Sequence, residues 1–412
     1  MNVDCIGITP MKNAIPILTP LRGIAALCVV FFHARLILFP QWMTPLQDYT
    51  HFIENSYLWV DLFFILSGFV MMQVYANAFS RDKENPASSP PSHALSWGQF
   101  MWLRFSRIYP LFFITLVVLI VWESVKSANG LGFYGGALFE SWGVSGIPAF
   151  NGPFNRFDAL LPNLFMLHGI TETDLTWNIS SWSLSVEWLS YMVFPFLVPL
   201  LLRKKLSYLT PLLFIAGLCV VNASKGTLDA TGGVLALLRA LSSFVLGAWL
   251  QTVTLSPRRQ QFFNHDITLL VVMMLSLGLL HLPTYSYHNV IVVTSFALLV
   301  FVAAQQTERK SPVFLLLDNK ITRFLGDISY SLYLWHAVLL LAGIEIAHHL
   351  MPETVARWYS QTSWFTAGIG ALVFALVTIG LSALSYFYFE KPVMKWLRAR
   401  MKKAPTSSSA TA

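Results

Sequence analysis

The chain has 412 residues, of which 55% are hydrophobic and only 11% are charged, and its mean hydropathy is +0.59. Because a soluble domain carries about 25% charged residues, this composition excludes an ordinary water-soluble protein and indicates a membrane protein. The net charge of +7 does not indicate a nucleic-acid partner, since the basic residues lie at the ends of apolar segments. The three cysteines have no metal-binding spacing, and we expect neither a metal site nor a disulfide framework.

The apolar segments are long enough for α-helices to cross a lipid bilayer, which needs about 20 residues per helix. Residues 1–16 contain charges and precede no small-residue cleavage pattern, so we predict a retained cytoplasmic N-terminal segment rather than a signal peptide. We predict an all-α polytopic membrane protein in which residues 17–392 form one membrane domain of about ten transmembrane helices. The expected spans are 17–39, 56–79, 103–125, 179–202, 207–222, 233–254, 266–282, 288–305, 325–349 and 363–389.

Basic residues concentrate in every second connection between these spans, which predicts that both termini are cytoplasmic. The predicted cytoplasmic segments contain Arg81, Lys83, Arg104, Arg107, Arg203, Lys204, Lys205, Arg258, Arg259, Arg309, Lys310, Lys320, Arg323 and the tail from Lys391 to Lys403. The predicted external segments contain only Lys126, Arg156, Lys225 and Arg357. The localisation that follows is a multi-pass protein of a bacterial inner membrane.

The segment LRGIAALCVVFFHA of the first span contains Arg22 and His33. Eleven residues at 100° per residue return to one helix face, about 16 Å further along the axis. Arginine can bind a phosphate, whereas histidine can accept a proton near neutral pH. The pair suits a long ligand with an anionic head at the cytoplasmic face. Alternatively, Arg22 extends to the lipid headgroups and His33 bonds a neighbouring helix.

The second and third spans carry further charges. Asp61 in WVDLFFILSGFVMM is interpreted as a packing residue, or as a hydrogen-bond partner that holds the helix of His33. Arg104 and Arg107 in RFSRIYP lie three residues apart on one helix face, next to the predicted cytoplasmic loop 80–102. They can bind phosphates together, or they can serve as ordinary cytoplasmic anchors of the span.

The predicted external loop 126–178 is long and rich in glycine and aromatic residues, which is typical of a loop that covers a site. Glu187 follows it in SWSLSVEWLSYMVF, where its carboxylate can orient a catalytic histidine, bind a sugar, or pair with a buried arginine such as Arg239.

Two further candidates lie in or next to the last two spans, and the chain then ends in a polar tail. His336 in SYSLYLWHA is interpreted as a packing residue. Glu390 in FEKP is interpreted as a helix-end residue paired with the adjacent Lys391. Residues 393–412 are expected to form a basic and then disordered cytoplasmic tail.

The segments LRGIAALCVVFFH, VDLFFILSGFV, RFSRIYP, SWSLSVEW, SYSLYLWH and FEKP, in this order, resemble the acyltransferase 3 family of bacterial integral-membrane O-acyltransferases. The resemblance runs from about residue 18 to residue 392. It implies a ten-helix domain that takes acyl groups from cytoplasmic acyl-CoA. It also implies an acceptor such as lipopolysaccharide O-antigen, exopolysaccharide, peptidoglycan or an antibiotic-like molecule. The length suggests the stand-alone form, without a C-terminal SGNH esterase domain.

The resemblance assigns the family's paired basic residue and histidine to Arg22 and His33, and its RxxR motif to Arg104 and Arg107. The expected mechanism has these arginines holding the CoA phosphates. His33 then deprotonates the acceptor hydroxyl or carries the acyl group itself, with Glu187 as a positioning residue. No permanently bound cofactor is expected, and acetyl-CoA is the default donor. The acceptor, the acyl chain length and the oligomeric state stay open, as do a glycolipid transporter, a small-molecule acyltransferase acting on a macrolide, and a regulatory family member.

Overall fold

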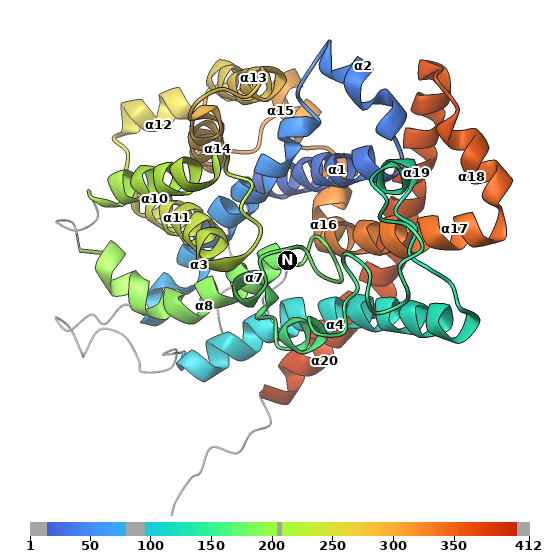
Figure 1. Cartoon of the computed structure of the whole chain (residues 1–412). Helices are drawn as coiled ribbons and strands as arrows, with labels where there is room; N and C mark the ends of the chain where they lie inside the picture. The colour runs from blue at the N-terminus through green and yellow to red at the C-terminus, as the bar shows by residue number, and fades with distance from the viewer. Residues whose placement is uncertain (1–14, 80–94, 204–207, 402–412) are drawn as a thin grey trace, which may run out of the picture.

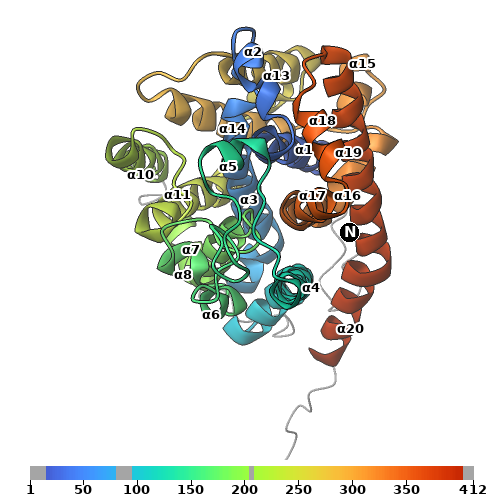
Figure 2. The same cartoon turned by 45° about the vertical axis from the view of Figure 1, so that its right-hand side comes forward.

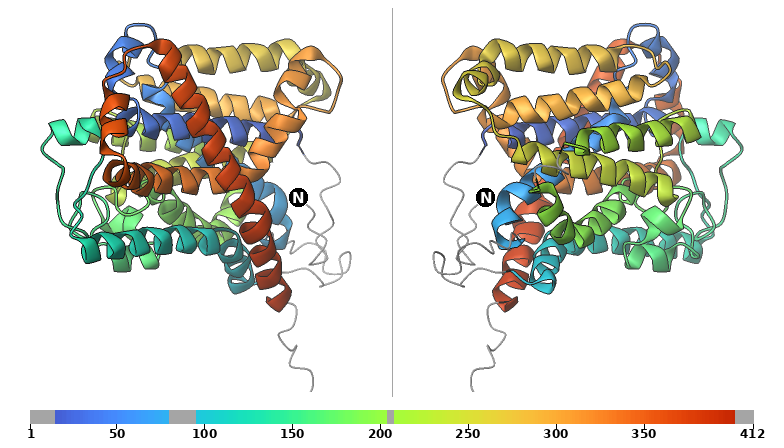
Figure 3. Two further views of the ribbon diagram at one scale, coloured as in Figure 1. Left: turned by 90° about the vertical axis from the view of Figure 1, so that its right-hand side faces the viewer. Right: turned by 90° about the vertical axis from the view of Figure 1, so that its left-hand side faces the viewer.

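The computed structural model describes residues 15–79, 95–203 and 208–401. Within these ranges the chain is helical, and its only β-pairing is two isolated bridges, Gly132 with Pro148 and Asn151 with Arg156. The long helices run alongside one another in a single bundle (Figures 1 and 3). Most of the predicted loop 80–102, most of the N-terminal segment and the end of the tail lie outside the described residues, together with Lys204 and Lys205.

Seven helical stretches among the described residues are long and apolar enough to cross a membrane, which confirms the all-α polytopic membrane fold. Four are single helices: α1 (Leu18–Ile37), α4 (Trp97–Asn129), α8 (Trp182–Leu201) and α11 (Gly233–Thr252). The stretch Glu54–Phe79 contains α3 (Trp59–Phe79). The stretch Pro312–Leu350 contains α15 (Pro312–Leu317), α16 (Lys320–Val338) and α17 (Ile344–Leu350), and Trp364–Met401 contains α19 (Trp364–Ser385) and α20 (Lys391–Met401).

Three of the ten predicted spans fall on less regular helices. A bend of 57° separates α12 (Pro257–Phe263) from α13 (Asp266–His281), and the two count together as one further candidate span. The helices α10 (Thr210–Lys225) and α14 (His288–Ala304) are apolar but shorter. Every predicted span therefore coincides with a helix, while the number of membrane crossings and the cytoplasmic location of both termini stay predictions.

The helix α4 is longer than the sequence predicted at both ends. Ser96 caps it through a reciprocal pair of hydrogen bonds with Gln99, so residues 97–102 are helical and not part of a loop. At its other end α4 continues to Asn129 and stops where Gly130 adopts a left-handed conformation with φ of 64°. The predicted external loop consequently begins at residue 130 rather than 126.

The segment between α4 and α8 is ordered by its own short helices. It contains α5 (Ala137–Ser141), α6 (Leu160–Leu164) and α7 (His168–Thr171), with the last packed on α8. The earlier part of this segment, teal in Figure 3, extends from one end of the bundle. The aromatic residues of the segment pack against one another, as in the contacts of Phe133 with Phe139 and Phe154, so this connection is not a disordered linker.

Two helix pairs approach closely enough to exclude side chains between their backbones. A methyl group added to Gly326 of α16 would lie 2.1 Å from the carbonyl oxygen of Thr19 in α1, and one added to Gly247 of α11 would lie 1.9 Å from the carbonyl oxygen of Ile65 in α3. Small residues allow this approach in membrane helices, where packing rather than the hydrophobic effect drives association. The pairs α1 with α16 and α3 with α11 therefore form the centre of the bundle (Figure 2).

Candidate active site

A cavity of about 170 Å³ opens between α1, α3, α4, α8 and α16. Four of the five predicted site residues line it, although they lie up to 165 positions apart in the chain. They are Arg22, Arg104, Arg107 and Glu187. The structure therefore brings these four charged side chains together around one cavity.

Arg22 extends from α1 towards α16, where it donates a long hydrogen bond of 3.4 Å to the hydroxyl of Ser329. No carboxylate of the described residues lies within ion-pair distance of its guanidinium group. A partly buried guanidinium with a neutral partner keeps donors available for an anion.

The two arginines of the RxxR motif have different partners. Arg104 is 8% exposed and donates to the hydroxyl of Tyr75 at 2.5 Å, with no carboxylate partner among the described residues. Arg107 instead donates to Glu390, whose second oxygen accepts a hydrogen bond of 2.6 Å from Ser331. The interpretation of Glu390 as a local partner of Lys391 is therefore wrong, because this carboxylate is buried and turned towards α4.

Glu187 lies on the cavity wall and does not pair with Arg239. Its carboxylate accepts a hydrogen bond of 2.5 Å from Tyr191, one helical turn further along α8, and that phenol lies 2.8 Å from the hydroxyl of Ser67. Since two arginines of the cavity lack a carboxylate partner and Glu187 is the single acidic residue on its wall, the cavity carries an excess of positive charge.

Arg239 pairs with Asp61 instead, and both side chains are fully buried. The guanidinium donates to Oδ2 of Asp61 from Nη2 at 2.7 Å and to Oδ1 from Nε at 3.2 Å, and Ser243 donates to the same carboxylate at 3.2 Å. Asp61 thus joins α3 to α11, so the expectation that it holds the helix of His33 is wrong. This pair is saturated with hydrogen bonds and has a structural role.

His33 contacts a second histidine that the sequence analysis had assigned to packing. Nε2 of His336 in α16 lies 3.2 Å from Nδ1 of His33 in α1. The same Nδ1 lies 3.1 Å from the carbonyl oxygen of Val29, and Nδ1 of His336 lies 3.0 Å from the carbonyl oxygen of Leu332. The assignment of His336 to packing alone is therefore incomplete.

These contacts define the hydrogen positions in the histidine pair. A carbonyl oxygen only accepts hydrogen bonds, so both histidines carry their proton on Nδ1. The single Nδ1–H of His33 is then shared between the carbonyl oxygen of Val29 and Nε2 of His336. Nε2 of His33 is left with a free lone pair, and no described residue is hydrogen-bonded to it. The pair consequently presents one unprotonated imidazole nitrogen.

Tyr333 connects the histidine pair to the charged cavity. Its ring lines the cavity, and the ring centroid lies 6.0 Å from that of His336, one turn along α16. The hydroxyl of Tyr333 lies 2.7 Å from that of Ser183 on α8. Arg22 and His33 on α1, like Ser329 and His336 on α16, are thus arranged along two adjacent helices, with the cationic end and the imidazole end separated by Tyr333.

The described residues of the site contain no cluster of side chains typical of a metal site. Among residues 15–79, 95–203 and 208–401, no group of three or more His, Cys, Asp or Glu side chains is close enough to hold one. The arginines supply groups for anion binding, and the histidine pair supplies groups for proton transfer.

Comparisons with known proteins show the family of the chain. A family model described as an acyltransferase domain matches residues 17–389. The chain is 24% identical over 443 aligned positions to Acyltransferase MdmB of Streptomyces mycarofaciens, with 98% of this chain and 97% of that protein covered. It is 33% identical over 103 positions to Protein 2 in picA locus of Rhizobium radiobacter, which covers 25% of this chain and 42% of that protein. No solved structure matches. Because the family model spans nearly the whole chain, the protein belongs to the acyltransferase 3 family and is a membrane-embedded acyltransferase.

Proposed function

We propose that this protein transfers an acyl group, by default acetyl, from acyl-CoA to a hydroxyl group of a cell-envelope polysaccharide such as O-antigen or exopolysaccharide. The observation that carries the proposal is the positively charged cavity of Arg22, Arg104 and Arg107 next to a histidine pair with a free Nε2. Acyl-CoA has the matching shape, with phosphates at one end and a thioester at the other.

The arginines bind the donor at the predicted cytoplasmic face. Arg22 and Arg104 have no carboxylate partner among the described residues, so a CoA phosphate adds charge-assisted hydrogen bonds without breaking an existing ion pair. Arg107 is ion-paired with Glu390, so this pair adds little net charge and offers no free donor fork. The pantetheine arm then extends past Tyr333 towards His33.

The histidine pair performs the proton transfers. Nε2 of His33 accepts the proton of the acceptor hydroxyl while that oxygen attacks the thioester carbonyl. The carbon–sulfur bond breaks, and the departing thiolate takes the same proton from the His33 imidazolium. His336 accepts a hydrogen bond from Nδ1–H of His33 throughout the reaction. This contact keeps Nε2 of His33 directed at the substrates and stabilises the His33 imidazolium while it exists.

The glycan acceptor approaches from the opposite face, where the segment between α4 and α8 covers the end of the bundle. Two internally satisfied charge groups lie at this end. Lys126 of α4 pairs with Glu123 of α4 and Glu345 of α17 at 2.7 and 2.9 Å, and Arg156 of the segment pairs with Glu172 at 2.9 Å. We propose that the rigid surface between them limits which hydroxyl groups reach His33.

Proton NMR of surface polysaccharides tests the proposal. A strain lacking the protein is compared with the same strain carrying wild type, His33→Ala, or His281→Ala as a control at an exposed histidine of α13. We expect O-acetyl signals with wild type and the control, and none with His33→Ala, at equal membrane abundance. Restoration by His33→Ala contradicts the mechanism.

An acyl pattern that does not change when the protein is removed excludes these glycans as acceptors. The same strains are then supplied with isotope-labelled acetyl groups, and extracted small molecules are tested for the label, because a macrolide-type acceptor stays compatible with the site. Absence of any acceptor-dependent release of free CoA by purified protein would leave a transporter as the function, since transport consumes no thioester.

A further inference from the structure

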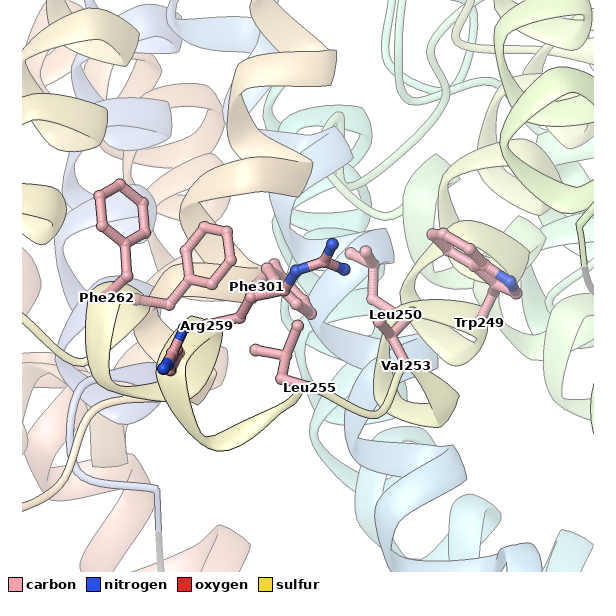
Figure 4. A pocket seen from close by; sticks show the side chains of 9 residues that line it. Trp249, Leu250, Val253, Leu255, Arg259, Phe262 and Phe301 are labelled. Atoms are coloured by element: carbon pink, nitrogen blue, oxygen red, sulfur yellow. The ribbon is translucent and has the colours of Figure 1, made fainter.

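A second and larger groove lies at the end of α11, away from the charged cavity. Its volume is about 560 Å³, and it has no lining residue in common with the site of Arg22 and His33. Figure 4 shows apolar side chains of α11, of the turn after it, and of α14 gathered beside Arg259 of α12. The groove is lined by Trp249, Leu250, Val253, Leu255, Arg258, Arg259, Phe262, Phe263 and Phe301.

The short helix α12 forms one wall of this groove because the chain bends by 57° before α13. Phe263 anchors α12 on α14, with its ring 5.3 Å from that of Phe301 and its carbonyl oxygen accepting a hydrogen bond of 2.6 Å from Gln306. Phe262, by contrast, is 62% exposed. The groove therefore has an apolar side chain, that of Phe262, facing outward near the end of α11.

Two arginines at this groove are not neutralised by the protein. Arg258 and Arg259 are exposed, and neither has an ion pair or hydrogen bond with the part of the chain that the structure describes. The nearby Arg309 differs, because it donates to Asp266 at 2.7 Å, to Asn264 at 2.8 Å and to Gln306 at 2.6 Å. The positive charge of Arg258 and Arg259 is thus available to an external anion.

We propose that this groove binds one anionic phospholipid, with the phosphate between Arg258 and Arg259 and an acyl chain along Leu255, Val253 and Phe301. Basic pockets between membrane helices on the cytoplasmic side bind anionic headgroups, and each nearby arginine adds attraction. A soluble anion would leave the apolar wall of the groove uncovered, and a neutral lipid would leave the two arginines without a counterion. The lipid braces the bend between α12 and α13 against α11 and α14.

Native mass spectrometry of the full-length protein tests this site. The purified protein is equilibrated with equal amounts of phosphatidylglycerol and phosphatidylcholine, and the retained lipids are counted. We expect wild type to retain phosphatidylglycerol preferentially, and Arg258→Gln with Arg259→Gln to reduce that retention about tenfold. The matched control, Lys320→Gln with Lys395→Gln, removes two exposed positive charges elsewhere on the same face and keeps the preference.

A second variant separates groove binding from surface charge. Leu255→Trp fills the apolar wall without changing charge, and we expect it also to lose phosphatidylglycerol, while excess inorganic phosphate leaves the wild-type complex intact. The proposal is overturned by unchanged retention in the arginine variant, by an equal loss in the lysine control, by retention in Leu255→Trp, or by displacement of the lipid by phosphate. Size-exclusion profiles confirm that each variant is folded.

Discussion

Two groups of charged residues inside the helix bundle differ in how fully the protein satisfies them. Asp61 and Arg239 are fully buried and bond each other through both carboxylate oxygens. Arg22 and Arg104 lie in a cavity that α3, the helix of Asp61, also lines, and they have hydroxyl groups rather than carboxylates as partners. The first group joins α3 to α11, whereas the second retains positive charge for a ligand.

This difference shows that burial alone does not tell whether a charged residue in a membrane span has a structural or a functional role. A charge within a membrane span costs several kcal/mol unless it is paired or hydrated, and a cavity can provide the hydration. The comparison therefore predicts that substitutions in the cavity and the histidine pair reduce turnover, whereas substitutions in the saturated pair reduce stability.

The largest expected effect is on chemistry at His33. Replacing it with alanine removes the only free imidazole nitrogen of the pair, and we expect the turnover rate to fall by about 10²–10⁴-fold. Release of free CoA by purified protein in the presence of acceptor measures this rate. A reduced rate with an unchanged thermal unfolding midpoint would show that His33 acts in turnover rather than in stability. A rate within threefold of wild type would show that His33 is not required for turnover.

Breaking the saturated pair is expected to change stability instead. Asp61→Ala leaves Arg239 buried without a counterion, which costs about 3–5 kcal/mol. We expect a lower thermal unfolding midpoint and less protein in the membrane, with an unchanged KM for acyl-CoA in the protein that stays folded. The double variant Asp61→Leu with Arg239→Met removes both charges and should recover part of the loss. A raised KM with normal stability would reverse the assignment.

His336 is expected to have an intermediate effect as a positioning residue. His336→Phe keeps an aromatic ring but removes one of the two acceptors of Nδ1–H of His33 and leaves only the carbonyl oxygen of Val29, and we expect kcat to fall about 10–100-fold at constant KM. In His336→Gln the side-chain amide oxygen can replace that acceptor, so part of kcat should return. Equal rates for the two variants would show that His336 only fills space.

The smallest of these effects is expected at Arg22. Arg22→Gln removes one charge-assisted contact to a CoA phosphate, and we expect the KM for acetyl-CoA to rise about tenfold with kcat nearly constant. Acetyl-pantetheine, which lacks those phosphates, provides the control donor and should show no such rise. A proportional loss with both donors would indicate that Arg22 supports the fold rather than the donor.

The fold followed from the sequence because its signals are local. Apolar segments and flanking charges predicted each long helix of the bundle but none of the short helices, and the spacing of Arg22 and His33 predicted their common face on α1. The ends of α4 were misjudged because Trp97–Trp102 is a mixed segment whose helical state depends on the Ser96 cap, which hydropathy does not detect.

The partners of the charged residues could not be predicted, since they are brought together by packing over long sequence separations. His33 meets His336 across 303 positions, Arg107 meets Glu390 across 283, and Asp61 meets Arg239 across 178. One signal was present: an ionisable side chain in the middle of a span is a functional candidate, and that rule applied to His336 as much as to His33.

The most direct test of the central claim is equilibrium binding of CoA to the protein in lipid nanodiscs. The account predicts saturable binding by wild type and by the control Lys320→Gln, with Arg22→Gln weaker by about tenfold and Arg22→Gln with Arg104→Gln weaker still. Binding of CoA by the double variant with wild-type affinity would contradict the assignment of this cavity to the donor.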